Sequence, residues 1–115
     1  MVDLINKKII LVNSVKIAQM QIQQEEKADG KGSFYVMGDD KPLAEMTYTI
    51  ANNKLMIIQH TEVDDVLQGK HAGHELIDAG VSYAREKGLK IFPLCPFVKS
   101  VFEKNEDKYK DVWNK

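Results

Sequence analysis

The alternation of apolar and polar residues predicts a series of strands in the first half of the chain. Apolar positions recur with strand-like spacing in residues 33–37, 43–50 and 55–63, and polar turns containing Gly, Pro or Asn separate these segments. Residues 20–25 alternate in the same way. We therefore expect an antiparallel meander of three or four strands that begins near Met20.

The clearest helical pattern follows the last of these strands. Small and apolar residues occur at positions that share one face of a helix, namely Gly73, Leu76, Ile77, Gly80 and Ala84. Gly88 comes directly after Lys87 and predicts a helix end in the left-handed conformation, with Leu89 folded back toward Ala84. Residues 89–92 form a short apolar segment. Because a helix separates this segment from the preceding strand, the two strands should be parallel.

The last regular element should be a helix that begins at Pro96, because proline suits the first helical position and Cys95 then becomes the N-cap. The sequence thus predicts an α/β fold with an antiparallel meander, a crossover helix, one short parallel strand and a C-terminal helix. We expect the parallel strand pair to splay at its C-terminal ends and to open a crevice for a ligand. The compact domain should span residues 20–115. Residues 1–19 would form an N-terminal extension, in which the apolar run 9–12 fits either a strand or a short helix.

Length, charge and cysteine content narrow the class of protein. A chain of 115 residues is enough for one domain with its own core. The formal net charge of -1 gives no reason to expect nucleic acid or an anionic membrane as a partner. No apolar run is long enough to span a membrane. A single cysteine excludes an internal disulfide and fits a reducing cytosol, so we expect a cytoplasmic protein.

The junction between residues 55–63 and the helix combines features that bind phosphate. Backbone N–H groups at a helix start have no intrahelical partners, and the helix dipole adds partial positive charge there. Gly69 permits a close approach of the backbone, and Lys70 adds a cation. The alternative is a strand–helix turn whose glycines serve packing alone, since short glycine motifs recur by chance.

Cys95 and His60 are the candidate catalytic residues. A cysteine at the N-cap of a helix lies at the positive end of the dipole, which favours the reactive thiolate. The alternative is a small, buried apolar side chain. His60 precedes the loop and could act as a base near neutral pH, or it could be a half-buried histidine bonded to a backbone carbonyl. His71 and His74 follow in the first helical turn, but no carboxylate or cysteine spacing completes a metal site with them, so we expect no metal.

These features together resemble the GNAT superfamily of acyl-CoA-dependent N-acyltransferases. The helix opens with Gln68-Gly69-Lys70-His71-Ala72-Gly73, which is similar to the superfamily motif of Arg or Gln, two residues, Gly, one residue, and Gly or Ala. A narrower resemblance is to a small, single-domain GNAT-like branch with an HT-x-V strand end and a C-P-F-V segment. It rests on His60-Thr61-Glu62-Val63, Gly69-Lys70, Tyr83-Ala84-Arg85, Pro93-Leu94-Cys95-Pro96-Phe97-Val98 and Glu103-Lys104-Asn105.

The resemblance implies acetyl-CoA as a cosubstrate. In the superfamily the loop amides cradle the pyrophosphate of CoA, and the pantetheine arm bonds to the end of the preceding strand. On this chain the implied cofactor site comprises Thr61, Glu62, Val63, Gln68, Gly69, Lys70, His71, Ala72, Gly73 and Lys104. Two residues depart from the pattern, because His71 replaces the usual glycine and Phe102 stands where a tyrosine commonly acts as the acid. Cys95 is then the nearest titratable candidate for that role.

The expected activity is acetyl transfer from acetyl-CoA to an unidentified primary amine. His60 would take the amine proton, and Cys95 would either protonate the leaving thiolate or briefly carry the acetyl group. The acceptor would be a small molecule or a peptide amine, and the protein a monomer or weak homodimer. The competing hypothesis is a CoA-binding or protein-interaction module with little catalysis, which the missing tyrosine and the substituted glycine favour.

Overall fold

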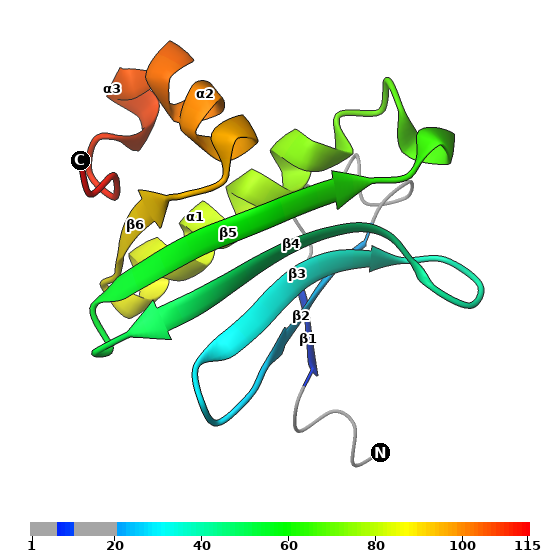
Figure 1. Cartoon of the computed structure of the whole chain (residues 1–115), viewed down its shortest axis with the longest axis horizontal. Helices are drawn as coiled ribbons and strands as arrows, with labels where there is room; N and C mark the ends of the chain where they lie inside the picture. The colour runs from blue at the N-terminus through cyan, green and yellow to red at the C-terminus, as the bar shows by residue number, and fades with distance from the viewer. Residues whose placement is uncertain (1–6, 11–20) are drawn as a thin grey trace.

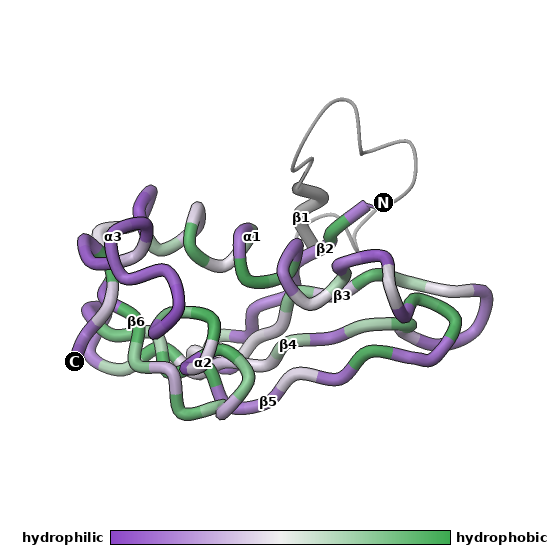
Figure 2. The backbone as a smooth tube through the Cα atoms, turned by 90° about the horizontal axis from the view of Figure 1, so that it is seen from above, coloured by the Kyte–Doolittle hydropathy of each residue, from purple (hydrophilic) through white to green (hydrophobic). Residues whose placement is uncertain are grey.

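The strands form one twisted sheet, with helices on one face and at one end (Figure 1). The structure is a computed structural model that describes residues 7–10 and 21–115. Six strands follow one another across the sheet in sequence order: β1 (Lys7–Ile10), β2 (Ile22–Glu26), β3 (Lys31–Met37), β4 (Pro42–Ala51), β5 (Leu55–Val63) and β6 (Lys90–Pro93). The helices are η2 (Asp65–Leu67), α1 (Ala72–Lys87), α2 (Pro96–Lys104) and α3 (Glu106–Tyr109). Viewed from above, α1 lies along one side of the sheet, and α2 and α3 group near β6 (Figure 2).

Strands β1 to β5 form an antiparallel meander that is longer than the three or four strands predicted. The strand that the prediction lacked is β1, which pairs with β2 from Lys7 opposite Glu25 to Ile10 opposite Ile22. It lies within the segment 1–19 that we expected to be an extension. The sequence pattern did not distinguish a strand from a helix in this segment, because an edge strand is defined by its backbone hydrogen bonds to a partner strand elsewhere in the chain. The division of the chain at residue 19 stays a prediction.

The crossover prediction is confirmed, since β5 and β6 are parallel and are connected through α1. Their pairing ends with Ile58 opposite Pro93. The amide of Cys95 adds one more bond, to the carbonyl oxygen of Ile58 at 2.9 Å, and the chain then turns into α2. Among the described residues, 59–63 therefore have no strand partner on the β6 side. The sheet is open at that end.

Helix α1 packs on the sheet through the face that the sequence predicted, and all five residues of that pattern are buried. Gly80 allows a close approach, because an added Cβ would lie 2.9 Å from the Cε of Met46. Glu75, in the first turn of the helix, is also buried, at 8% exposed. The helix ends at Gly88 with φ 71°, and the amide of Leu89 bonds back into the last turn at 2.8 Å, as predicted.

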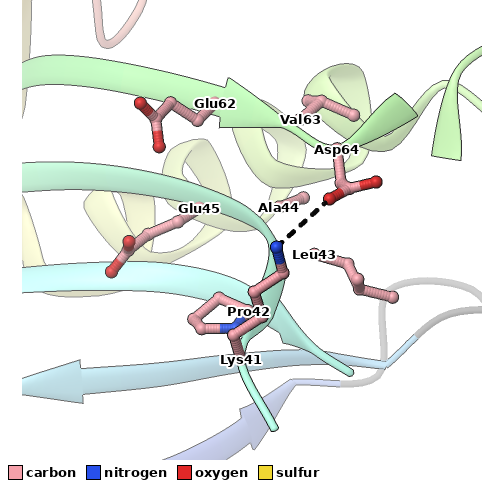
Figure 3. A pocket seen from close by; sticks show the side chains of 8 residues that line it. All are labelled: Lys41, Pro42, Leu43, Ala44, Glu45, Glu62, Val63 and Asp64. Atoms are coloured by element: carbon pink, nitrogen blue, oxygen red, sulfur yellow. Dashed lines mark ion pairs between the residues drawn. The ribbon is translucent and has the colours of Figure 1, made fainter. Parts of the chain in front are cut away.

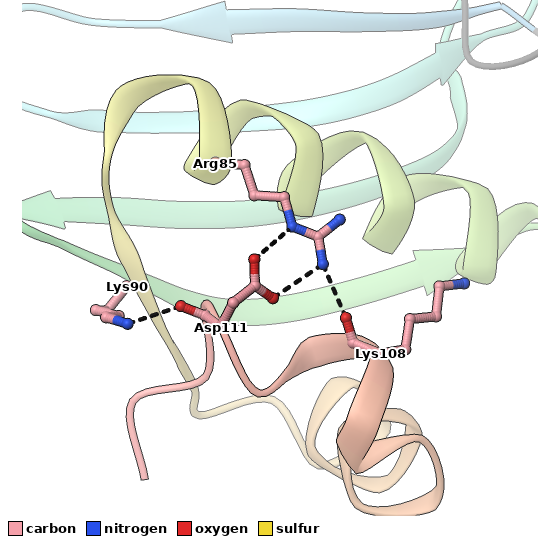
Figure 4. Close-up of polar contacts among 4 residues, drawn as sticks. All are labelled: Arg85, Lys90, Lys108 and Asp111. Atoms are coloured by element: carbon pink, nitrogen blue, oxygen red, sulfur yellow. Dashed lines mark hydrogen bonds and ion pairs between the residues drawn. The ribbon is translucent and has the colours of Figure 1, made fainter.

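The C-terminal segment is fastened to α1 and to the outer edge of β6 (Figure 4). Arg85 donates to both carboxylate oxygens of Asp111, at 2.9 and 3.0 Å, and to the carbonyl oxygen of Lys108 at 2.8 Å. The guanidinium holds the pKa of the Asp111 carboxyl below its usual value. Beside this cluster, residues 112–114 form a short parallel bridge with Ile91. These bonds fix the position of α2 and α3 relative to the sheet.

Candidate functional site

A short turn joins the end of β5 to α1 and holds the connecting loop in a fixed shape. Asp64 caps η2, since its Oδ1 accepts a hydrogen bond from the amide of Val66 at 3.0 Å. The amides of Leu67 and Lys70 donate to carbonyl oxygens within the same turn, at 2.9 and 3.1 Å. The turn is thus closed by its own backbone bonds before α1 begins.

The two residues that flank Lys70 adopt left-handed backbone conformations. Gly69 has φ 80°, and no atom lies within 4 Å of the place where a Cβ would stand. His71, the N-cap of α1, has φ 60° and ψ 30°. Glycine adopts this conformation readily, whereas other residues pay about 1–2 kcal/mol for it. The geometry therefore explains why glycine suits the position that His71 occupies.

The start of α1 presents backbone amides that lack an acceptor. Within the described part of the chain, the amides of His71, Ala72, Gly73 and His74 donate no hydrogen bond. The first bond of the helix runs from the amide of Glu75 to the carbonyl oxygen of His71, at 3.0 Å. Free amides at the positive end of a helix dipole favour an anion.

A pocket of about 380 Å³ opens over these amides. Its walls come from four parts of the chain: Thr61 and Val63 on β5, the loop below, the first turn of α1, and Phe97 on α2. Phe97 lies across the first turn of α1, since a Cβ added to Gly73 would lie 2.8 Å from its Cε2. The ring also meets His74 edge-on, with ring centroids 5.6 Å apart. Gly73 is therefore needed for α2 to come this close to α1.

A β-bulge in β5 turns Thr61 and Val63 toward this pocket. The register between β4 and β5 shifts at Gln59, which is an extra residue on β5. Ile58 before the bulge lies in the core beneath α1, and Thr61 after it lies on the same side of the sheet. Regular alternation would put these two on opposite faces, and His60 on the side of the pocket. The bulge thus decides which residues of the strand end reach the pocket.

Cys95 lies directly behind Thr61. It is the N-cap of α2 with Pro96 at the first helical position, as predicted, and it is only 5% exposed. Its Sγ–H donates to the Oγ1 of Thr61 at 3.5 Å, and its side chain caps no amide of the helix. Cys95 does not itself line the pocket, and the side chain of Thr61 lies between its thiol and the pocket.

His60 and Cys95 do not share a pocket. The Nε2 of His60 lies 3.1 Å from the Oε2 of Glu62, and both side chains are exposed. Glu62 lines a different cavity, on the opposite face of the sheet from the pocket over the loop. His60 is therefore exposed and not the half-buried histidine of the alternative interpretation.

Seven of the ten residues predicted for the cofactor site line the pocket, namely Thr61, Val63, Gln68, Gly69, His71, Ala72 and Gly73. The other three, Glu62, Lys70 and Lys104, are exposed and do not line it. Leu67, His74 and Phe97 line the pocket but were not predicted. Two of these residues could have been found from the sequence. His74 is one helical turn from His71, and Phe97 belongs to the C-P-F-V segment. No group of three or more potential metal ligands occurs in the ranges that the structure describes.

Comparisons with known proteins identify the family of this chain. The family model for GCN5-related N-acetyl-transferases matches residues 33–112. The chain belongs to that family. It is also similar to a GCN5-like candidate N-acetyltransferase from Staphylococcus aureus, solved by NMR, at 39% sequence identity and a TM-score of 0.64. That similarity covers 84% of this chain and 90% of the other. No curated protein matches the chain.

As a member of the GCN5-related family, the chain is an acyltransferase, and the family generally uses acetyl-CoA. The residues present fit that cosubstrate, because four acceptor-free amides and an open left-handed glycine face the pocket. The tyrosine position remains a departure, since Phe102 is fully buried and stacks on Tyr109 with centroids 4.5 Å apart. No helix in the described part is long and apolar enough to cross a membrane.

Proposed function

We propose that this protein transfers the acetyl group of acetyl-CoA to a primary amine. The proposal rests on the row of acceptor-free amides at the start of α1, beneath a pocket that reaches the end of β5, where the described residues provide no strand partner on the β6 side. A pyrophosphate would supply acceptors for those amides. Backbone groups of β5 beyond Ile58 would bond an extended arm of the same molecule, as an added strand does.

The loop from Gln68 to Gly73 would hold the phosphates, and residues 61–63 would hold the arm. Lys70 is exposed beside the loop and would add positive charge. Lys104 lies in the last turn of α2, outside the pocket lining, so we assign it a contribution of charge alone. When bound, acetyl-CoA supplies a thioester whose carbonyl carbon the amine can attack.

His60 and Cys95 divide the proton transfers in this proposal. His60, beside Glu62, takes a proton from the attacking amine while the new C–N bond forms. The C–S bond of the thioester breaks, and the sulfur leaves as a thiolate. Cys95 either gives that thiolate its proton, or first accepts the acetyl group on its own sulfur and passes it to the amine. The contact between Cys95 and Thr61 supports a connection from the thiol to the pocket.

The cofactor site is tested by a pair of glycine substitutions at the two ends of α1. Gly69 and Gly88 both have left-handed φ angles, 80° and 71°, and open space where a Cβ would stand. Gly69→Val and Gly88→Val therefore carry similar conformational costs, but only Gly69 lines the pocket. We expect Gly69→Val to weaken CoA binding by more than tenfold, about 1.4 kcal/mol, in isothermal calorimetry. Gly88→Val should bind like the wild type, and equal weakening in both would refute the site.

Cys95→Ala tests the chemical step. We expect the variant to bind CoA like the wild type and to lose most acetyl transfer, because the loop positions the cofactor while the sulfur serves the reaction. Cys95→Ser is the second variant, since it keeps a donor toward Thr61 and separates loss of packing from loss of sulfur. Bound CoA should also protect Cys95 from alkylation. Slow alkylation that CoA does not affect would remove Cys95 from the mechanism.

The buried Phe102 favours a second candidate function, a CoA-binding module with little catalysis, because phenylalanine cannot donate a proton. An unbiased screen for acetylated products with polyamines, amino acids and lysine peptides separates the two functions. Tight CoA binding without turnover on any of these amines would favour the module.

A further inference from the structure

Two histidines stand together in the wall of the pocket over the loop. Of the described residues that line this pocket, His71 and His74 alone are titratable. His71 is the N-cap of α1, and His74 follows one helical turn later. The centroids of their rings lie 6.0 Å apart, and His74 meets Phe97 on its other side. Both imidazoles are therefore within one turn of the acceptor-free amides at the start of α1.

The ring contacts leave the nitrogen atoms of both imidazoles without a partner. Among the described residues, neither ring takes part in an ion pair or a hydrogen bond. An N-cap side chain usually accepts a bond from an amide of its own helix, but the side chain of His71 does not. Both side chains are exposed. The imidazole nitrogens are thus available to a ligand in the pocket.

On the side of β5 and η2, the acidic residues near the pocket do not line it. Glu62 and Asp64 line the cavity on the other face of the sheet, where Asp64 pairs with Lys41 at 3.8 Å (Figure 3). Asp65 in η2 is exposed. The end of β5 and the turn after it therefore bring no carboxylate into the pocket.

On the side of the helices, the charged residues also lie outside the pocket lining. Asp78, one turn beyond His74 on α1, pairs with Lys108 at 3.5 Å, and Glu75 is buried. Lys70 in the loop and Lys99 on α2 are exposed. In the pocket, the two imidazoles would therefore meet the charge of a ligand and no carboxylate of the described chain.

A pyrophosphate in this pocket would favour the protonated form of both histidines. An imidazole ordinarily ionises near pH 6.5, and a negative charge close by stabilises the imidazolium, in which both ring nitrogens are donors. The pyrophosphate of CoA is a diester that carries two negative charges and has no proton to release near neutral pH. Any proton taken up with it must therefore come to the protein.

We propose that the imidazoles of His71 and His74 bind the pyrophosphate of CoA in their protonated forms, so that the protein takes up protons from solution when it binds its cosubstrate. The inference rests on the cofactor site proposed above. It gives the two side chains a role in addition to that of the loop amides. Because protons bind together with the cosubstrate, the affinity should fall as the pH rises past the range in which free imidazoles ionise.

Binding of 3′-dephospho-CoA at pH 6 and pH 8, measured by calorimetry, tests the two histidines. This ligand keeps the pyrophosphate but lacks the 3′-phosphate, a monoester of the kind that titrates near pH 6. If both titration midpoints rise by about half a pH unit, the wild type should bind about sixfold more weakly at pH 8 than at pH 6. His71→Asn combined with His74→Gln should remove this difference, since asparagine tolerates the left-handed backbone and neither new side chain titrates.

His60 supplies the matched control, because it is exposed, lies outside the pocket lining and carries the third imidazole of the chain. His60→Gln should keep the sixfold difference in binding. NMR titration of the wild type is a second measurement that needs no variant. We expect the midpoints of His71 and His74 to rise when 3′-dephospho-CoA is bound, and that of His60 to stay unchanged.

The outcomes separate this inference from the proposed function. Histidines that only pack against Phe97 would change the affinity by the same factor at both pH values. Equal affinity of the wild type at pH 6 and pH 8, or a difference that the double variant retains, would refute the inference while acetyl transfer stands. A difference seen with CoA but not with 3′-dephospho-CoA would assign the proton to the 3′-phosphate and would also refute it. If the expected difference occurs but no amine is acetylated, the inference stands and the proposed transfer fails. If the wild type binds neither ligand, both fail.

Discussion

Gly73 and Phe97 form the contact that brings α2 against α1, and a double-mutant cycle can measure it. A Cβ at position 73 would lie 2.8 Å from the Cε2 and 2.9 Å from the Cζ of Phe97. The ordinary separation of such carbon atoms is about 3.5–4.0 Å, so the added methyl group has to displace the ring. In the opposite direction, alanine is preferred over glycine within a helix by about 1 kcal/mol.

The balance of these two effects predicts a change of sign. Overpacking costs about 1–3 kcal/mol, so we expect Gly73→Ala to lower the free energy of unfolding by about 1 kcal/mol in the wild type. In the Phe97→Ala background the ring is gone, and the same substitution should raise the free energy of unfolding by about 0.5–1 kcal/mol. The coupling free energy between the two positions is then about 1.5–2 kcal/mol.

Urea unfolding of the four proteins in the cycle measures this coupling, and calorimetry with CoA reports whether the pocket changes with it. Gly80→Ala is the control, because its Cβ would meet the flexible end of Met46 at 2.9 Å rather than a ring. Its effect should not depend on Phe97. A coupling below about 0.5 kcal/mol between Gly73 and Phe97 would show that the two effects are additive and would refute the reasoning.

Two further predictions concern a tyrosine and the N-terminal strand. Burial, and to a smaller extent the hydrogen bond that Tyr83 donates to Glu26, raise the pKa of Tyr83 to about 12. In an absorbance titration, the phenolate of the wild type should therefore form at a higher pH than that of Glu26→Gln. An unfolded tyrosine ionises near pH 10, whereas folded Tyr83 keeps its proton there. The contribution of Tyr83 to the free energy of unfolding is therefore complete below about pH 10 and is lost as the pH rises to about 12. Identical titration curves for the wild type and Glu26→Gln would contradict this prediction. Deletion of residues 1–19 should leave a folded protein that binds CoA, because β1 lies at the edge of the sheet. Loss of cooperative unfolding would show instead that β1 is essential.

Features that depend on neighbouring residues could be predicted from the sequence. The left-handed end of α1 needs a residue without a Cβ, and Gly88 supplies it. The start of α2 follows from Pro96, whose missing N–H costs nothing at the first helical position. The loop from Gln68 to Gly73 was found for the same reason, since its left-handed glycine and free amides are local properties.

Features that depend on pairing across the sheet could not be predicted in this way. The bulge at Gln59 exists only in the register of β5 with β4, and it alone places His60 on the open face and Thr61 beneath the pocket. A strict period of two along β5 gives the reverse assignment. Phe97 was missed as a pocket residue because its contact with Gly73 joins two helices that the sequence separates by a strand.

The bridge between residues 112–114 and Ile91 bears on how two molecules of this protein can associate. An edge strand with unpaired backbone groups is where one sheet adds a strand from another chain. At β6 those positions are taken by the C-terminal residues, which the pair of Arg85 and Asp111 holds in place. A second molecule would have to displace this segment before it could pair there. Among the described strands, the other edge of the sheet is β1, so a strand from a second molecule that leaves the C-terminal segment in place could pair only there.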